Sequence, residues 1–176
     1  MSVTLYVVDT SYLLEYAGCA RDSNPEAHKR VHELFKAVNK SGGRFFVPLP
    51  CLFELGDHIA DVRHDAKRAQ LAEWLQQIVE RSLSRGRPWE ITPMGDPGVI
   101  LPALLERFQE LAGRRRMGMV DSFVVHEAER LKVRLKATKA RVHIWTNDHA
   151  LKACEPDQDP DPYLWGSDGK SIPLRR

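Results

Sequence analysis

The stretch VTLYVVDTS, from Val3 to Ser11, decides the fold of this chain. Its first six residues are mostly β-branched or apolar, which predicts a short buried strand of a parallel sheet. Asp9 follows at once, and the hydroxyls of Thr10 and Ser11 can then cap a short helix. A strand that ends at an acid and passes directly into a helix is the repeating unit of an α/β fold.

The same alternation of strand and helix continues along the chain. Further strands are predicted at 44–47, 89–92 and 142–145, and helices at 25–39, around Glu54, around 71–79, at 101–112 and at 119–135. We expect Leu105 to face inward, Glu54 to lie in the first turn of its helix and Asn147 to cap a last helix. Repeated units of this kind predict a three-layer α/β/α sandwich with a central, mostly parallel sheet.

Length and composition set the organisation. The 176 residues are 43% hydrophobic and 28% charged, which fits a single domain over 1–176 with an exposed, irregular tail from about residue 155. The three cysteines form no CxxC pair, so reduced thiols in a cytoplasmic protein are expected. No signal peptide is recognisable and no apolar run is long enough to span a bilayer, which predicts no membrane association.

Four short acidic motifs carry the functional signal. They are VVDTS around Asp9, PCLFEL around Glu54, MVDSF around Asp121 and TNDHAL around Asp148. Each acid has apolar neighbours and no adjacent lysine or arginine, and an ionised carboxylate in such a place needs a partner or a cation. Because the carboxyl ends of parallel strands share one edge, we expect one crevice to receive all four. They predict a shared Mg²⁺ or Mn²⁺ ion and phosphate chemistry.

Each acid also has a plainer interpretation. Asp9, Asp121 and Asp148 could each do no more than cap a helix, and Glu54 could be an ordinary solvated helix residue. The joint order of the four motifs favours a common function.

In that order and context, the motifs resemble a PIN domain. The match runs from Val7 to Leu151, and the family contains metal-dependent ribonucleases, including the VapC-type toxins of toxin–antitoxin pairs. The resemblance implies that Asp9, Glu54, Asp121 and Asp148 are both catalytic residues and metal ligands, supported by the polar residues Thr10, Ser11 and Thr146. It also implies an RNA substrate, a small antitoxin protein and a homodimer as partners.

A basic run stands just before Asp121 and predicts contacts with RNA phosphates. It consists of Arg114, Arg115 and Arg116, in a link between two helices, and five further basic residues between 132 and 141 extend the positive charge. Such residues attract a phosphate backbone without reading its sequence. The alternative is a solvated helix end or a contact with an antitoxin.

The leading hypothesis is therefore a Mg²⁺- or Mn²⁺-dependent endoribonuclease. A Mg²⁺-dependent phosphatase of similar topology would need Asp-x-Asp after the first strand, and Ser11 occupies the second of these positions. The non-enzymatic alternative is a catalytically silent PIN-like scaffold that binds RNA or protein. The loss of one or more acids would mark such a scaffold, and all four are present.

Overall fold

A four-stranded sheet forms the centre of the protein. The computed structural model describes residues 3–19, 25–115 and 117–158. Its strands are β1 (Thr4–Val8), β2 (Arg44–Pro48), β3 (Glu90–Thr92) and β4 (Arg141–Trp145). They lie in the order β3-β2-β1-β4, and every neighbouring pair is parallel. The predicted α/β fold with a parallel sheet is confirmed.

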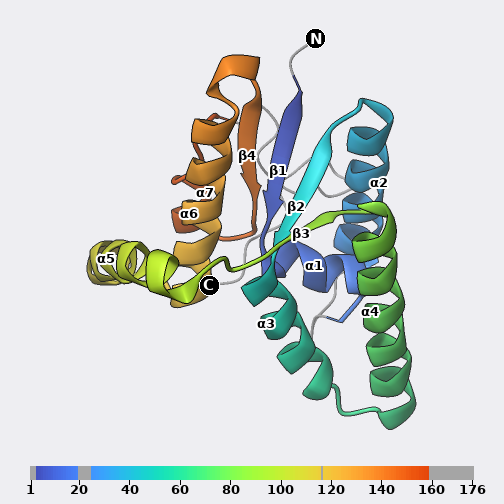
Figure 1. Ribbon diagram of the computed structural model, residues 1–176. Coiled ribbons are helices and arrows are strands. Elements are labelled where there is room, and N and C mark those ends of the chain that lie inside the picture. The colour runs from blue at the N-terminus through green and yellow to red at the C-terminus, as the bar shows by residue number, and fades with distance from the viewer. Residues whose placement is uncertain (1–2, 20–24, 116, 159–176) are drawn as a thin grey trace.

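Helices link the strands and cover both faces of the sheet. They are α1 (Thr10–Ala17), α2 (Pro25–Lys40), α3 (Leu49–Ala60), α4 (Asp65–Arg85), α5 (Pro97–Arg115), α6 (Met119–Arg134), the 3₁₀ helix η1 (Lys136–Thr138) and α7 (His149–Lys152). The chain passes from β1 through β2 to β3 and then returns to β4, so right-handed crossovers put the earlier and later helices on opposite faces. Figure 1 shows α2 and α4 on one side and α6, with α5 packed against it, on the other. None of the helices described is both long and apolar enough to cross a membrane.

The sheet face toward α2 is packed with aromatic rings. Phe35 of α2 stacks on Phe45 of β2 with 4.3 Å between ring centroids, and Trp145 of β4 contacts both rings. All three side chains are buried. Each aromatic pair contributes about 0.5–1.5 kcal/mol beyond its buried area. This layer fixes α2 against both β2 and β4 and stabilises the sheet on which the candidate site is built.

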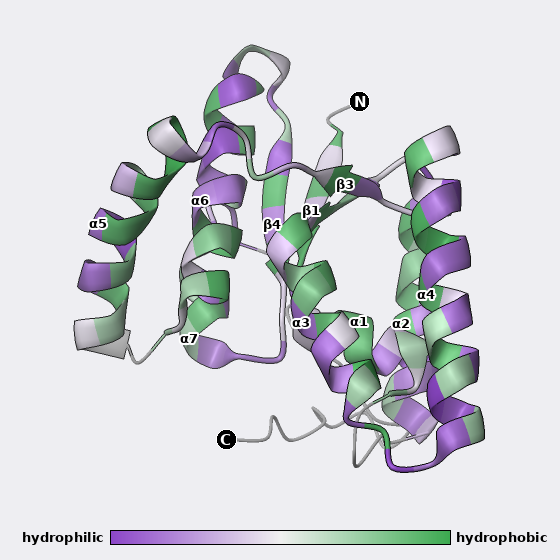
Figure 2. Ribbon diagram, turned by 60° about the horizontal axis from the view of Figure 1, so that its bottom comes forward, coloured by the Kyte–Doolittle hydropathy of each residue, from purple (hydrophilic) through white to green (hydrophobic). Residues whose placement is uncertain are grey.

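Helix α6 covers the other face with smaller apolar side chains. Val124, Ala128 and Leu131 recur at the predicted helical spacing, and all are buried. Figure 2 shows bands of hydrophobic and hydrophilic colour along both α6 and α4, the pattern of helices with one face on the core and one face in solvent. The close packing of α6 on the sheet holds its first turn, which carries Asp121, at the carboxyl edge of the strands.

Two helix caps differ from the prediction. Helix α1 begins at Thr10, and its N-cap is Asp9, whose carboxylate accepts the Ser11 backbone N–H at 3.3 Å. Helix α7 is capped by Asp148 and not by Asn147. In both places the cap lies one residue or more from the predicted one, because a carboxylate is a stronger acceptor for the free N–H groups of a helix start than a hydroxyl or an amide.

Three predictions for α3 and α5 are also wrong. Helix α3 begins at Leu49, so Glu54 lies beyond its first turn. Leu105 of α5 is 53% exposed and does not face inward, because α5 packs mainly on α6 and only a narrow stripe of α5 is covered. Helix α5 continues to Arg115, so Arg114 and Arg115 belong to its last turn and not to a link between helices.

The segment after α7 is irregular, as predicted, but its first residues are not an exposed tail. The Asp157 carboxylate accepts the Val142 N–H at 2.7 Å, and the Glu155 carboxylate accepts the Ile144 N–H at 3.2 Å. Lys152 donates to the Ile144 carbonyl at 2.8 Å. These side chains satisfy polar groups along the outer edge of β4, where a neighbouring strand would otherwise bond. Residues 159–176 of the predicted tail lie outside the described residues.

Candidate functional site

The four predicted acids gather at the carboxyl edge of the sheet. Asp9 follows β1, Asp148 follows β4, Glu54 lies on the helix after β2, and Asp121 lies in the first turn of α6. Since parallel strands end at the same edge, four segments that are distant in sequence meet there. Two side-chain hydrogen bonds join three of these segments: Thr10 to Glu54, 44 positions apart, and Thr146 to Asp9, 137 positions apart.

Asp9 lies at the buried centre of this group. It is 6% exposed, and its Oδ2 accepts hydrogen bonds from the Ser11 hydroxyl at 2.7 Å and the Thr146 hydroxyl at 2.9 Å. Burial raises the pKa of Asp9 above its ordinary value of 3.8, and the hydrogen bonds from Ser11 and Thr146 oppose that rise. Burial therefore destabilises the ionised form of Asp9, and the hydroxyl donors of Ser11 and Thr146 stabilise it.

The two hydroxyls beside Asp9 are themselves oriented by the loop after β4. Ser11 Oγ accepts the Asn147 N–H at 2.9 Å, and Thr146 Oγ1 accepts the Asp148 N–H at 3.0 Å. With a backbone donor on one side, each hydroxyl directs its own hydrogen to Asp9. Ser11 and Thr146, predicted as supporting polar residues, thus bind an acid directly and tie the end of β1 to the end of β4.

Glu54 is held by the third supporting residue. Thr10 is 5% exposed and donates its hydroxyl hydrogen to Glu54 Oε2 at 2.6 Å, so Glu54 is not simply a solvated helix residue. The neighbouring Phe53, which belongs to the apolar surroundings expected of Glu54, is 60% exposed. Sequence reasoning missed Cys51, one turn earlier on the buried side of α3. Burial, together with the Asp9 and Glu54 carboxylates, holds the pKa of the Cys51 thiol well above its usual range, which keeps the thiol protonated.

Asp121 carries the clearest electrostatic signature of the group. Its carboxylate accepts the Gly118 N–H at 2.8 Å, an arrangement that closes the N-terminus of α6. Burial, and to a smaller extent the negative charges of Asp9, Asp148 and Glu54, together raise the pKa of Asp121 from 3.8 to about 6, against the lowering effect of the Gly118 hydrogen bond. The charges of the other three acids therefore all act on the Asp121 carboxylate.

Asp148 is the most exposed of the four. Its Oδ1 accepts the Ala150 N–H at 2.6 Å and the Leu151 N–H at 3.1 Å. Asp9, Asp121 and Asp148 all cap helices, so the plainer interpretation describes real contacts of these three. Capping alone does not explain why three helices begin at the same edge of the sheet. That arrangement brings three negative charges together, whereas capping requires only one acid at each helix start.

The donor set suits a hard divalent cation. Carboxylate and hydroxyl oxygens are the ligands that Mg²⁺ and Mn²⁺ prefer. The mutual repulsion recorded at Asp121 is the kind that a cation relieves. Across residues 3–19, 25–115 and 117–158, no three histidine, cysteine, aspartate or glutamate side chains are close enough to hold one ion, so the fit is one of chemistry and charge.

The predicted basic residues divide between two regions. Arg116 lies outside the described residues, and for Arg114 and Arg115 the structure describes the helical backbone but not the side chains. The other basic residues predicted to extend the positive charge lie at the amino edge of the sheet, at the opposite end from the acids; they are Lys132, Arg134, Lys136, Lys139 and Arg141. They therefore extend the positive charge away from the acids, because α6 runs the full length of the strands between the two groups.

The acids, hydroxyls and thiol described at this edge all belong to this one chain, and the function of the edge is inferred from these residues. No protein-family model matches the sequence, and a comparison with curated proteins finds no match.

Proposed function

We propose that this protein is a metal-dependent endoribonuclease of the PIN type, with Mg²⁺ or Mn²⁺ held by Asp9, Glu54, Asp121 and Asp148. The observation that carries the proposal is the meeting of these four acids at one sheet edge, where Thr10, Ser11 and Thr146 hold two of them in place. Phosphodiester hydrolysis at such an edge needs no nucleophilic side chain, because a water molecule can attack.

The residues of the chain would divide the work. A bound Mg²⁺ or Mn²⁺ polarises a phosphodiester and lowers the pKa of a water molecule. Asp9, which is buried and bonded through Oδ2, supplies a fixed negative charge, and Ser11 and Thr146 keep its orientation. Asp121, with a pKa of about 6, is close to the range in which a carboxylate exchanges protons near neutral pH. Attack of water in line with the leaving oxygen would leave 5′-phosphate and 3′-hydroxyl ends.

The choice of RNA as substrate, and the partners that go with it, come from the resemblance to PIN domains. By the same resemblance we propose a cytoplasmic protein that acts as a homodimer, and a small antitoxin protein as its inhibitor. The arginines Arg114, Arg115 and Arg116 would contact RNA phosphates.

Cleavage of a labelled single-stranded RNA tests the proposal. The parent should cut RNA in Mg²⁺ or Mn²⁺ and stop cutting in EDTA. Asp9→Asn should lower the rate of cleavage at least about 100-fold, since mutation of residues that only hydrogen-bond to metal ligands already lowers metal affinity or activity about 10- to 100-fold. Asp65→Asn is the matched control, because Asp65 is an exposed acid in the first turn of α4.

Two outcomes would contradict the proposal. Cutting at an equal rate in EDTA would exclude the metal, and cutting by Asp9→Asn at the parent rate would exclude this site. Retained RNA binding without any cleavage by the parent would instead support the scaffold alternative.

A further inference from the structure

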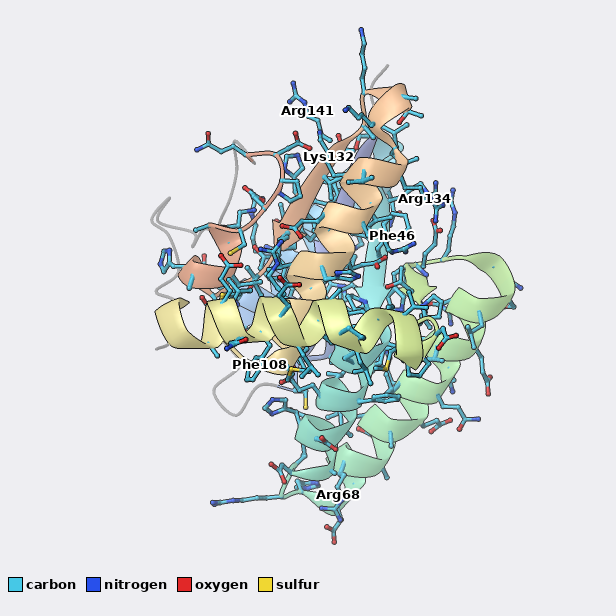
Figure 3. All side chains as sticks on the ribbon, turned by 60° about the vertical axis from the view of Figure 1, so that its left-hand side comes forward. Phe46, Arg68, Phe108, Lys132, Arg134 and Arg141 are labelled. Carbon is cyan, nitrogen blue, oxygen red and sulfur yellow. The ribbon has the colours of Figure 1, made fainter. Side chains whose placement is uncertain are left out.

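The second charged surface of the protein lies at the amino edge of the sheet. It consists of Arg134, Lys136, Lys139 and Arg141, and all four side chains are exposed. We call it the amino-edge basic surface. Figure 3 shows Arg134 and Arg141, with Lys132, at the same end of the molecule, far from Arg68 at the other end.

The fold brings these residues together through one tight connection. Arg134 is the last residue of α6, Lys136 lies in η1, and Arg141 begins β4 beside Thr4 of β1. Lys139, between η1 and β4, has φ +54°, a left-handed conformation that glycine adopts with least strain. A lysine side chain is thus displayed at a turn where the backbone would favour glycine, which is the kind of local strain that gathers at functional positions.

The positive charge of this surface is not cancelled by the acids next to it. Asp157 is bound by Lys132 at 2.6 Å, and Glu90 is bound by Arg44. Both acids are therefore neutralised by cations outside the four that define the surface. With the four carboxylates at the carboxyl edge, the two ends of the sheet carry opposite charge.

We propose that the amino-edge basic surface binds RNA phosphates upstream or downstream of the bond that is cut. The inference rests on the proposed function and extends it to a longer substrate. Asp121 and Arg134 are thirteen residues apart on α6, or about 20 Å at 1.5 Å per residue. At 3.4 Å per phosphate along a helical strand, about six nucleotides span that distance.

The chemistry of the surface predicts contacts with phosphates and none with bases. Guanidinium and ammonium groups bind phosphate oxygens of any sequence. Phe46, an aromatic residue of β2, is 5% exposed and lies under the Arg44 guanidinium, so it offers no platform for a stacked base. Val133 is the one large apolar side chain exposed among residues 132–141, too little to anchor the surface in a lipid layer.

Binding measured without cleavage tests this inference. Binding of two RNAs, one of about 20 nucleotides and one of about four, is measured in EDTA with the Asp121→Asn variant. The measurement is repeated with a variant that also has Gln in place of Arg134, Lys136, Lys139 and Arg141. At about 0.7 counterions per phosphate contact, the four changes should reduce the slope of log affinity against log salt by about 2 to 3 for the long RNA. The short RNA should show a smaller change, because it has fewer phosphates to contact than the surface has cations.

The controls match charge and guard against misfolding. Lys29, Lys36, Arg63 and Lys67 changed to Gln remove the same charge from exposed positions elsewhere and should leave the slope unaltered. The double variant Lys136→Gln and Lys139→Gln keeps the helix-end arginine and should show about half the effect. Melting curves verify that each variant folds.

Three results would overturn the inference. They are an unaltered slope for the long RNA, an equal loss with the control variant, or binding of vesicles rich in phosphatidylserine in preference to RNA. Because the readout is affinity in EDTA, it is separate from the proposed cleavage. Absence of cleavage by the parent would refute the proposed function while leaving this measurement intact.

Discussion

Replacing Asp121 by Asn should stabilise the metal-free protein and destabilise the metal-bound one. The substitution removes a negative charge and keeps the shape of the side chain, and Asn Oδ1 can still accept the Gly118 N–H. Raising the pKa of Asp121 from 3.8 to about 6 corresponds to about 3 kcal/mol of cost for the ionised form. Since the side chain is partly open to solvent, screening reduces this to about 1 kcal/mol.

The expected effect depends on pH in a defined direction. Below about pH 4, Asp121 is protonated in both the folded and the unfolded protein, and the substitution should change little. Between about pH 4 and 6 the unfolded chain ionises first, so the free energy of unfolding of the parent falls as pH rises. Above about pH 6 the full cost is present in the parent and absent in Asp121→Asn.

Urea unfolding at about pH 4 and pH 8, in EDTA and in saturating Mn²⁺, measures these differences. In EDTA at the higher pH the variant should be more stable by about 1 kcal/mol, or about 2–4 °C in melting temperature for a chain of this size. In Mn²⁺ at a hundred times its dissociation constant the parent gains about 2.7 kcal/mol and the variant much less, so the order reverses. A variant less stable than the parent in EDTA would show that Asp121 is chiefly a helix cap, and the absence of any Mn²⁺ effect on the parent would refute the shared site.

Two further predictions concern the protons and the ion pairs. Metal binding requires an ionised Asp121, so the affinity for Mn²⁺ should rise as the pH passes through the Asp121 pKa of about 6, and the raised pKa of Asp9 acts in the same direction. Calorimetry in two buffers of different ionisation enthalpy measures the protons released, and an affinity independent of pH between about 5 and 8 would contradict this prediction. Lys152→Met leaves the buried Glu155 carboxylate without its ammonium partner and should lower the free energy of unfolding by about 3–5 kcal/mol. Adding Glu155→Gln to this variant should restore most of the loss. A loss below about 1 kcal/mol would mean that the ion pair contributes little.

The fold was predictable because its signals are local. A β-rich run closed by an acid, and apolar residues at helical spacing, are visible in a single sequence, and these patterns predicted every strand that the structure describes. The errors lie at element ends and on α5. The choice between Thr10 and Asp9 as cap depends on competing hydrogen bonds, and the exposure of Leu105 depends on how much of α5 is covered by α6.

The candidate site was predictable only as a set of positions. The rule that parallel strands end at one edge placed Asp9 and Asp148 together, but it could not assign Thr10 to Glu54 or give Asp9 two hydroxyl donors. Those contacts depend on side-chain rotamers and on the approach of segments 44 and 137 residues apart. Cys51 left no sequence signal of its own, because a buried thiol and an ordinary core residue occupy the same kind of position.

The order of the strands also governs when this protein can fold as it is synthesised. β1 lies in the interior of the sheet between β2 and β4, yet β4 is made more than 130 residues later. Until then one side of β1 has open backbone groups, and the aromatic layer lacks Trp145. A growing chain can pair β1 with β2 early, but closure of the sheet must wait for a contact of very long sequence separation, which is the slow kind. The four acids therefore cannot all meet until nearly all of the described chain has been synthesised.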